Sequence, residues 1–413
     1  MSQQLLQLLT HVKKVGAAFD KGRKSNAKQA SYFPSTENVS FVPISPLKDT
    51  LPVELQIQIF AHCRIQDLLQ LKLVCRAFHQ ILSVHERQIS RRYLRLRRHG
   101  TLPSPIHSEK TYTRNPEDDV VLLSDLFMPA SSVKGGHLYT FRYILSLRRR
   151  QKLCSRLCYY LADRVMDRLL HSEPAFIKAN FPTKSERNAL VKRGIASLWF
   201  NLTPLMYYVL YFLETYCSAR REQTNTLLRD FETRQLPFPI PLNKRKTMNK
   251  ALQLEIIQSP PFTDTSTLIS THHCMQLLVS YLCHTVPPDE SIVPDNSWIH
   301  SLLTISPFIR VVEYFSAEIG DGGNQRLQRK EFMQNFHNDL RGSEKDEVSS
   351  LIFENPVGGH QHSSINDVWF DAAKQELARR NALPHDMEPM WICNGIPILF
   401  GCPDCNDSVG WHA

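Results

Sequence analysis

The sequence predicts a mainly α-helical protein with an N-terminal three-helix unit, a non-repetitive helical body and a short mixed C-terminal tail. Apolar residues recur at spacings of three and four over long stretches from Leu51 to Arg380, which is typical of helices. Clusters of proline divide these stretches from one another. From Met390 onward, short apolar runs alternate with glycine and proline, which favours strands or a hairpin.

The composition is that of an ordinary soluble globular protein. The 413 residues allow two or three domains, and 22% of them are charged while 42% are hydrophobic. A net charge of +9 suggests an acidic partner or surface without identifying nucleic acid. Ten cysteines without regular spacing indicate reduced thiols, and no signal-peptide pattern is evident, so we expect a cytoplasmic and/or nuclear location.

One segment resembles a membrane span. Leu198 to Leu213 is strongly apolar, but it is only about 16 residues long, shorter than the ~20 that a span requires. It also contains the polar Asn201 and Thr203, followed by Pro204. We therefore predict no membrane span here, but a buried core helix that is kinked or begins at Pro204.

The most apolar part of the chain begins at Leu51 and carries signals for three short helices in a row. Pro52 suits the first turn of a helix, so we expect the first helix to begin at Leu51. Asp67, followed three residues later by Gln70, indicates a capping box that opens the second helix. A third helix takes up apolar residues at steps of three or four as far as Ile89.

These helices are apolar on two sides. In the first, Leu55 and Ile59 share one side, while Ile57 and Phe60 share another. The second helix has the same two-sided pattern. Because a unit of roughly 40 residues is marginally stable alone, the surplus apolar surface predicts a permanent partner.

The order LPxEL, then IF, then DLLxLxxVCRxF resembles the F-box, through which a large eukaryotic family docks onto the Skp-type adaptor of SCF ubiquitin ligases. Many F-boxes carry a tryptophan near the end of the third helix, where this sequence has Gln88 and Ile89. The residues that fall on the pattern are Leu51, Pro52, Glu54, Leu55, Ile59, Phe60, Asp67, Leu68, Leu69, Leu71, Val74, Cys75, Arg76 and Phe78.

This resemblance implies a non-catalytic substrate receptor of a ubiquitin ligase. The adaptor joins such a receptor to a cullin, and the receptor holds a protein substrate in reach of the ubiquitin-conjugating enzyme without supplying a reacting group. The proline-punctuated helical body is similar in style to divergent F-box proteins of filamentous fungi. The expected adaptor-binding residues are Leu51, Pro52, Ile57, Phe60, Leu68, Leu69, Val74 and Cys75.

Composition shifts divide the chain into five expected segments. No repeat of fixed period occurs, so neither leucine-rich repeats nor a WD-repeat propeller is predicted. The segments are an N-terminal helix and flexible linker (1–48), the F-box (49–95), a linker with one docking element (96–136), a helical substrate-binding body (137–320) and a mixed C-terminal region (321–413). The helices expected after the F-box lie at 139–170, 189–216, 214–231, 248–257, 270–283, 298–319, 325–340 and 365–380.

Two other functions remain open from the sequence. The chain could bind the adaptor without a cullin and act as a scaffold. It could instead associate with nucleic acid through the arginine-rich end of the third helix, which contains Arg91, Arg92 and Arg95. Such a run of arginines more often forms a helix face that is exposed to solvent.

The tail contains a weak candidate for a zinc site. Cys402 and Cys405 form a CxxC pair, and Cys393 and His412 could complete a Cys3His set. Only one paired knuckle is present, so we expect free thiols and neither metal nor cofactor. No glycine-rich phosphate loop, GxSxG elbow or HExxH motif occurs, and we expect no catalytic residues.

Overall fold

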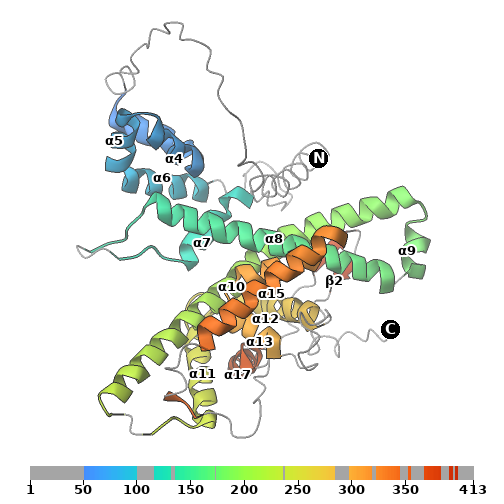
Figure 1. Ribbon diagram of the computed structural model, residues 1–413. Helices are drawn as coiled ribbons and strands as arrows, with labels where there is room; N and C mark the ends of the chain where they lie inside the picture. Colours follow the sequence, from blue (N-terminus) through green and yellow to red (C-terminus); the bar gives the residue numbers. More distant parts are fainter. Residues whose placement is uncertain are drawn as a thin grey trace. The chain divides into compact units, whose positions relative to one another are not determined.

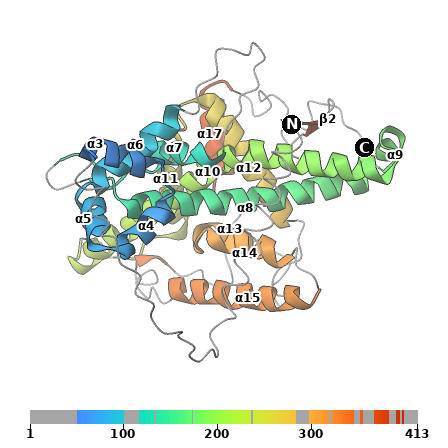
Figure 2. The same ribbon diagram turned by 90° about the horizontal axis from the view of Figure 1, so that it is seen from above.

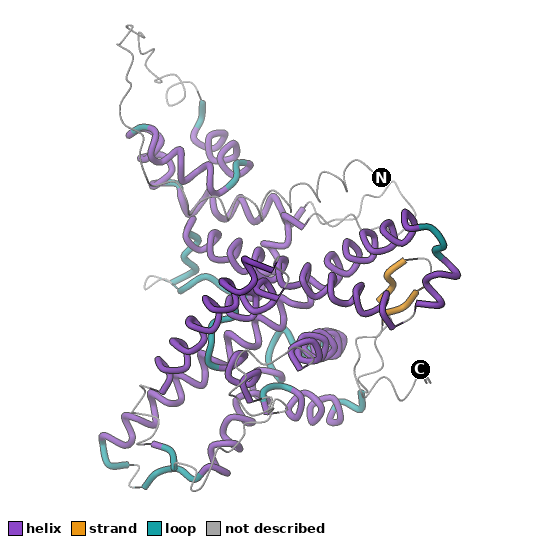
Figure 3. Tube along the Cα trace, turned by 45° about the vertical axis from the view of Figure 1, so that its right-hand side comes forward, coloured by secondary structure: helices purple, strands orange, loops and turns teal. Residues whose placement is uncertain are grey.

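Helices account for nearly all of the secondary structure that the computed structural model describes, as Figure 1 shows. One antiparallel hairpin, β1 (Met390–Cys393) and β2 (Ile396–Ile398), lies in the tail and is orange in Figure 3. The predicted mainly α fold is confirmed. The described residues are 51–99, 116–131, 135–172, 174–235, 238–283, 297–318, 322–344, 352–354, 367–382, 390–393 and 396–398.

The N-terminal helical region, which we define as α3 to α6, has four helices where three were predicted. Their interior is formed by buried apolar side chains, among them Phe60, Leu68, Leu82 and Ile89. Helix α3 packs on α6, and α4 packs on α5. The bounds are α3 (Val53–His62), α4 (Ile65–Val74), α5 (Arg76–Val84) and α6 (Glu86–His99).

Three local predictions for this region were wrong. Helix α3 begins at Val53, after Pro52. Asp67 is the third residue of α4, and the N-cap is Arg64 without a side-chain cap. The predicted third helix is interrupted at His85, where α5 ends and α6 begins. The sequence has no glycine or proline at this break. The break lies next to Glu86, whose contacts with residues distant in sequence cannot be predicted from a local pattern.

The body is built on two long helices. Helices α8 and α10 pack along one another and lie side by side in Figure 2. The predicted docking insert forms α7, whose Val120, Val121 and Leu123 are buried. The elements are η1 (Pro116–Asp119), α7 (Val120–Leu126), α8 (Phe141–Ser172), α9 (Pro174–Asn180) and α10 (Lys184–Glu232).

Helix α10 corrects the predicted interruption at Pro204, because it runs through this residue from Lys184. A capping box begins it: Glu186 N–H donates to Thr183 Oγ1 (3.2 Å), and Thr183 N–H donates to Glu186 Oε2 (3.0 Å). Proline inside a helix costs about 3 kcal/mol. The fully buried face of α10 offsets this cost through Leu198, Leu202, Met206, Val209, Leu210, Phe212 and Leu213.

Among the described helices, α10 alone meets length and composition criteria for crossing a membrane. Its best 18-residue window has a mean hydropathy of 1.2, and 44% of that window is buried inside the chain. Core helices of soluble proteins meet the same criteria, so this is weak evidence for a span.

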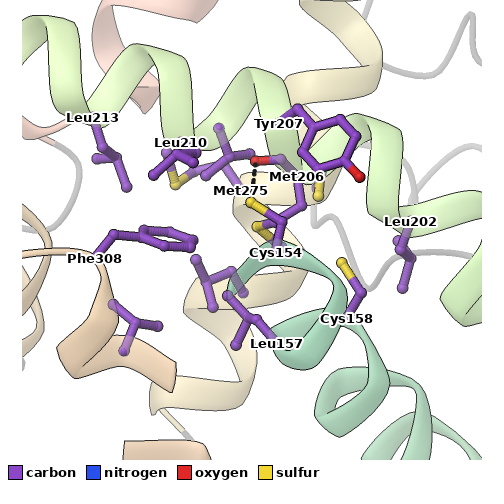
Figure 4. Packing of buried hydrophobic residues seen from close by; sticks show 14 of the residues in the cluster. Cys154, Leu157, Cys158, Leu202, Met206, Tyr207, Leu210, Leu213, Met275 and Phe308 are labelled. Atoms are coloured by element: carbon purple, nitrogen blue, oxygen red, sulfur yellow. Dashed lines mark hydrogen bonds between the residues drawn. The ribbon is translucent and has the colours of Figure 1, made fainter. Parts of the chain in front are cut away.

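Sulfur-containing side chains line the contact between α8 and α10, as the close view in Figure 4 shows. Cys154 Sγ of α8 donates to the carbonyl of Met206 on α10 (3.8 Å). Burial raises the pKa of the Cys154 and Cys274 thiols well above the usual value. These cysteines therefore serve as small apolar core residues.

The remaining helices differ from the predictions mainly at their ends. Pro307 separates two helices within the predicted helix 298–319, because proline cannot continue a helical hydrogen-bond pattern. The helix predicted at 325–340 begins earlier, at Gly322, and ends later, at Glu344. The bounds are α11 (Leu242–Ile257), α12 (Thr265–Cys283), α13 (Ser297–Thr304), α14 (Ile309–Glu318), α15 (Gly322–Glu344) and α17 (Phe370–Arg379).

A buried carboxylate fastens α17 to the end of α11. Glu376 has a side-chain exposure of 0% and accepts hydrogen bonds from Arg379, Arg380 and Gln258. Arg380 also donates to the carbonyl of Phe262 (2.9 Å). This network joins two segments that are 118 residues apart in sequence.

The C-terminal end of α10 carries a strained residue. Arg234 has a φ of 60°, in the left-handed region, and its N–H bonds to Phe231 O (3.0 Å) while Gln235 N–H bonds to Asp230 O (2.8 Å). Helices end with this bond pattern most often when glycine or asparagine occupies the left-handed position.

We expect Arg234→Asn to raise the free energy of unfolding by about 0.5 to 1 kcal/mol, because asparagine tolerates left-handed backbone better than arginine. Urea unfolding of the two proteins measures this difference. Arg229→Asn, at an exposed helical position on the same turn, is the matched control and should bring no gain. An unchanged or lower stability for Arg234→Asn would contradict the strain argument.

Candidate protein-binding surface

Several large apolar side chains of α3 and α4 are exposed. Val53, Leu55 and Ile59 of α3 have exposures of 42%, 46% and 48%, and Leu73 and Val74 of α4 have 87% and 62%. Single exposed apolar residues are normal, but five on two consecutive helices are typical of a surface that a partner covers. We call these five residues the apolar surface set.

Two of the eight predicted adaptor-binding residues lie inside the chain. Phe60 and Leu68 have exposures of 4% and 0%, and the ring of Phe60 packs edge-on against Phe78 with centroids 6.3 Å apart. A direct contact with a partner would require these side chains to be uncovered. In this structure they form the interior of the N-terminal helical region.

The other six predicted residues are at least partly accessible. Val74 and Pro52 are exposed, and Leu51 and Cys75 are half-buried. Ile57 and Leu69 are half-buried and pack against the core.

The eight predicted contact residues do not include Leu55 and Ile59, although both are exposed and both fall on the family pattern. Their spacing of four residues on one side of α3 was the available signal. Leu73 had no such signal, because the second helix is apolar on two sides and its sequence does not show which side is covered.

A carboxylate of α6 connects this region to the body. Glu86 Oε1 accepts a hydrogen bond from the N–H of Phe141, the first residue of α8 (2.7 Å). Its other oxygen pairs with Lys72 of α4 (3.2 Å), whose ammonium lies 5.2 Å from the Phe141 ring centroid. A negative group at a helix N-terminus is stabilising, so Glu86 supports α8 from outside that helix.

A tyrosine of α6 makes a second connection. Tyr93 is buried, and the guanidinium of Arg97 lies 3.4 Å from its ring centroid. Arg97 also donates to the carbonyl of Ala61 (3.3 Å), and Arg148 of α8 donates to the Tyr93 hydroxyl (2.7 Å). The basic residues Arg97 and Arg148 therefore bind within the chain.

The three arginines proposed for nucleic-acid binding differ in exposure. Arg91 is exposed, with its guanidinium 5.8 Å from the Tyr139 ring centroid. Arg95 is exposed, and Arg92 is half-buried. At the end of this helix, Arg98 forms an ion pair with Asp125 of α7. Part of the arginine-rich run thus holds the fold together.

The candidate zinc residues are mostly outside the described chain. The backbone of Cys393 lies in β1, while Cys402, Cys405 and His412 lie outside the described residues. Within the described ranges, no group of three or more His, Cys, Asp or Glu side chains is arranged to hold a metal ion. The expectation of free thiols in this tail stays a prediction.

A family model described as F-box-like matches residues 48–92, about a tenth of the 413 residues. Comparison with curated proteins and with solved structures finds no match. The similarity to fungal members stays a prediction, because the match concerns the domain alone. The matched residues include α3, α4, α5 and the first half of α6, with the whole apolar surface set. The chain therefore contains an F-box-like domain, which is followed by a helical body.

Proposed function

We propose that this chain is a substrate receptor that docks on the Skp-type adaptor of an SCF E3 ubiquitin ligase and presents a protein substrate for ubiquitination. F-box domains typically bind such adaptors and are generally non-catalytic recognition modules. The receptor raises the local concentration of substrate near the conjugating enzyme and takes no part in the bond chemistry. Its place of action would be the cytoplasm, the nucleus or both.

The observation that supports this proposal best is the apolar surface set within the family match. Burying an apolar side chain that is exposed in the free chain releases about 25 cal/mol per Å² of apolar area. We therefore assign the main adaptor contacts to Leu55, Ile59, Leu73 and Val74, with Pro52 beside them. Phe60 and Leu68 support these contacts from inside.

We expect the double variant Ile59→Ala/Leu73→Ala to bind purified adaptor about 30- to 20,000-fold more weakly, since each anchor contributes about 1 to 3 kcal/mol. Isothermal titration calorimetry measures the affinity, and circular dichroism verifies that the variant is folded. Leu327→Ala is the matched control, because Leu327 is 63% exposed on α15, outside the family match. Wild-type affinity in the double variant would refute the assigned contacts.

Recovery of a cullin distinguishes a ligase receptor from a scaffold. The tagged chain purified from eukaryotic cells should recover adaptor and cullin together, and the double variant should recover neither. Adaptor without cullin would support the scaffold instead.

A further inference from the structure

A row of basic side chains runs along the exposed side of helix α8. Their positions are spaced by three, four or seven residues, so they lie one after another on a single face of the helix. All of these side chains are exposed. From the first to the last, the helix rises by about 21 Å, at about 1.5 Å per residue. We call these residues the basic row: Arg142, Arg149, Lys152 and Arg156.

The two arginines next to Arg149 in the sequence are used inside the chain. Arg148 donates to the Tyr93 hydroxyl (2.7 Å), and Arg150 donates to Glu214 Oε2 on α10 (2.7 Å). Within the described ranges, by contrast, no residue of the basic row forms an ion pair with Asp or Glu. The structure therefore separates the basic residues of α8 into those that hold the fold together and those that face solvent.

The basic row lowers the stability of the helix that carries it. Like charges three or four residues apart on a helix repel each other, as Lys152 does with Arg149 and with Arg156. Arg142 adds a positive charge to the first turn of α8, where the helix dipole favours a negative one, and no acidic residue occupies that turn. A negatively charged partner would relieve this repulsion, because complementary charges are what two binding surfaces present to each other.

Neutral groups hold Arg156 in place at the end of the row. Its Nε donates to the hydroxyl of Tyr160 (2.8 Å), and a terminal nitrogen donates to Ser316 Oγ on α14 (3.0 Å). The Tyr160 hydroxyl in turn donates to Ser316 Oγ (3.2 Å). These bonds orient the guanidinium without neutralising its charge. An oriented cation loses less side-chain entropy when it binds a carboxylate than a mobile one does.

Acidic side chains limit the row to a short ligand. Further along the same face of α8, the half-buried Asp163 and the exposed Asp167 follow the cations. Their carboxylates would repel a continuous phosphate backbone. A nucleic-acid complex commonly involves about 6 to 10 phosphate contacts, which is more than the basic row can supply. The arrangement therefore favours a short acidic segment of a protein over nucleic acid.

We propose that the basic row binds an extended acidic segment of a substrate protein, with an acidic residue at every third position. In the polyproline II conformation every third side chain lies on the same side, about 9 Å from the next. Arg142, Arg149 and Arg156 are seven residues apart, which is about 10.5 Å along a helix, and their long side chains can accommodate the difference. This inference rests on the proposed function, because it names the kind of substrate that the receptor holds.

Fluorescence anisotropy of a labelled peptide tests the proposal with the full chain. The peptide consists of four Glu-Pro-Pro repeats, and the comparison peptide has the same composition with its glutamates adjacent. The wild type should bind the repeat peptide about threefold more tightly than the comparison peptide, and added sodium chloride should weaken this binding. Arg149→Gln/Lys152→Gln should weaken it about fivefold or more. Lys192→Gln/Arg193→Gln, at exposed positions of α10, removes the same charge and should leave the affinity within about twofold.

Several results would overturn the proposal. The wild type could fail to bind the repeat peptide at about 1 mM. Equal affinities for the two peptides would contradict the assigned spacing, and equal losses in the two double variants would reduce the effect to net charge. An oligothymidylate of the same charge that binds more tightly than the peptide, and is lost in Arg149→Gln/Lys152→Gln, would assign the row to nucleic acid.

Adaptor binding distinguishes failure of this proposal from failure of the proposed function. The Ile59→Ala/Leu73→Ala variant should bind the repeat peptide like the wild type, because its substitutions lie outside the basic row. Arg149→Gln/Lys152→Gln should bind purified adaptor like the wild type. A chain that binds the adaptor but not the peptide would overturn the acidic-segment proposal alone.

Discussion

Glu376→Ala is expected to lower the free energy of unfolding by about 3 to 5 kcal/mol, the usual cost of breaking a buried ion pair. The substitution leaves Arg380, whose side chain is 12% exposed, without its carboxylate at 2.6 Å. Arg379 is 64% exposed, so its bond to Glu376 contributes little. Urea unfolding measures the loss. Gln375→Ala, at an exposed position of the same helix, should change stability by no more than about 0.5 kcal/mol.

The lowered pKa of the Glu376 carboxylate determines how the free energy of unfolding depends on pH. Hydrogen bonds, first of all from Arg379, lower the pKa of Glu376 to about 2 from its ordinary 4.5, while burial opposes them. A group with a lowered folded-state pKa stabilises the protein above its unfolded pKa and loses this effect as the pH falls through the folded value. The stability gap between wild type and Glu376→Ala should therefore narrow from pH 5 to pH 2. A constant gap would show that the network acts without its charge.

Phe60→Ala is expected to cost about 3 to 5 kcal/mol, because it leaves a cavity in the interior of the N-terminal helical region. Ile59→Ala, one residue earlier, removes a side chain that is 48% exposed and should cost much less, within about 1 kcal/mol. Urea unfolding of both variants measures the contrast. Equal stabilities would mean that Phe60 is not a core residue.

Comparing Phe60→Ala with Ile59→Ala also separates loss of folding from loss of a direct adaptor contact. Loss of binding in Phe60→Ala should accompany loss of folded structure. Loss of binding in Ile59→Ala should occur in a folded chain.

Local patterns in the sequence were sufficient for the fold class and the family. Helical spacing predicted α8 almost to its ends, and the order of apolar and charged residues after Leu51 identified the F-box-like domain. Helix ends were less predictable. The break at His85 and the continuity through Pro204 depend on packing between segments that are distant in sequence.

The candidate protein-binding surface was also only partly predictable from the sequence. A helix that is apolar on two sides does not reveal which side faces the core, so Phe60 was predicted as a contact although its neighbour Ile59 is the exposed residue.

The bond from Phe141 to Glu86 has a consequence for exchanging domains between F-box proteins. A graft that ends at residue 95 would include Glu86 and Tyr93 but not their partners Phe141 and Arg148. In the transplanted piece Glu86 would keep its ion pair with Lys72 but lose the Phe141 N–H donor, and the Tyr93 hydroxyl would lose Arg148. In this protein a graft should therefore extend through the first two turns of α8. The boundary of the transferable domain is set by these contacts and not by the position of a loop.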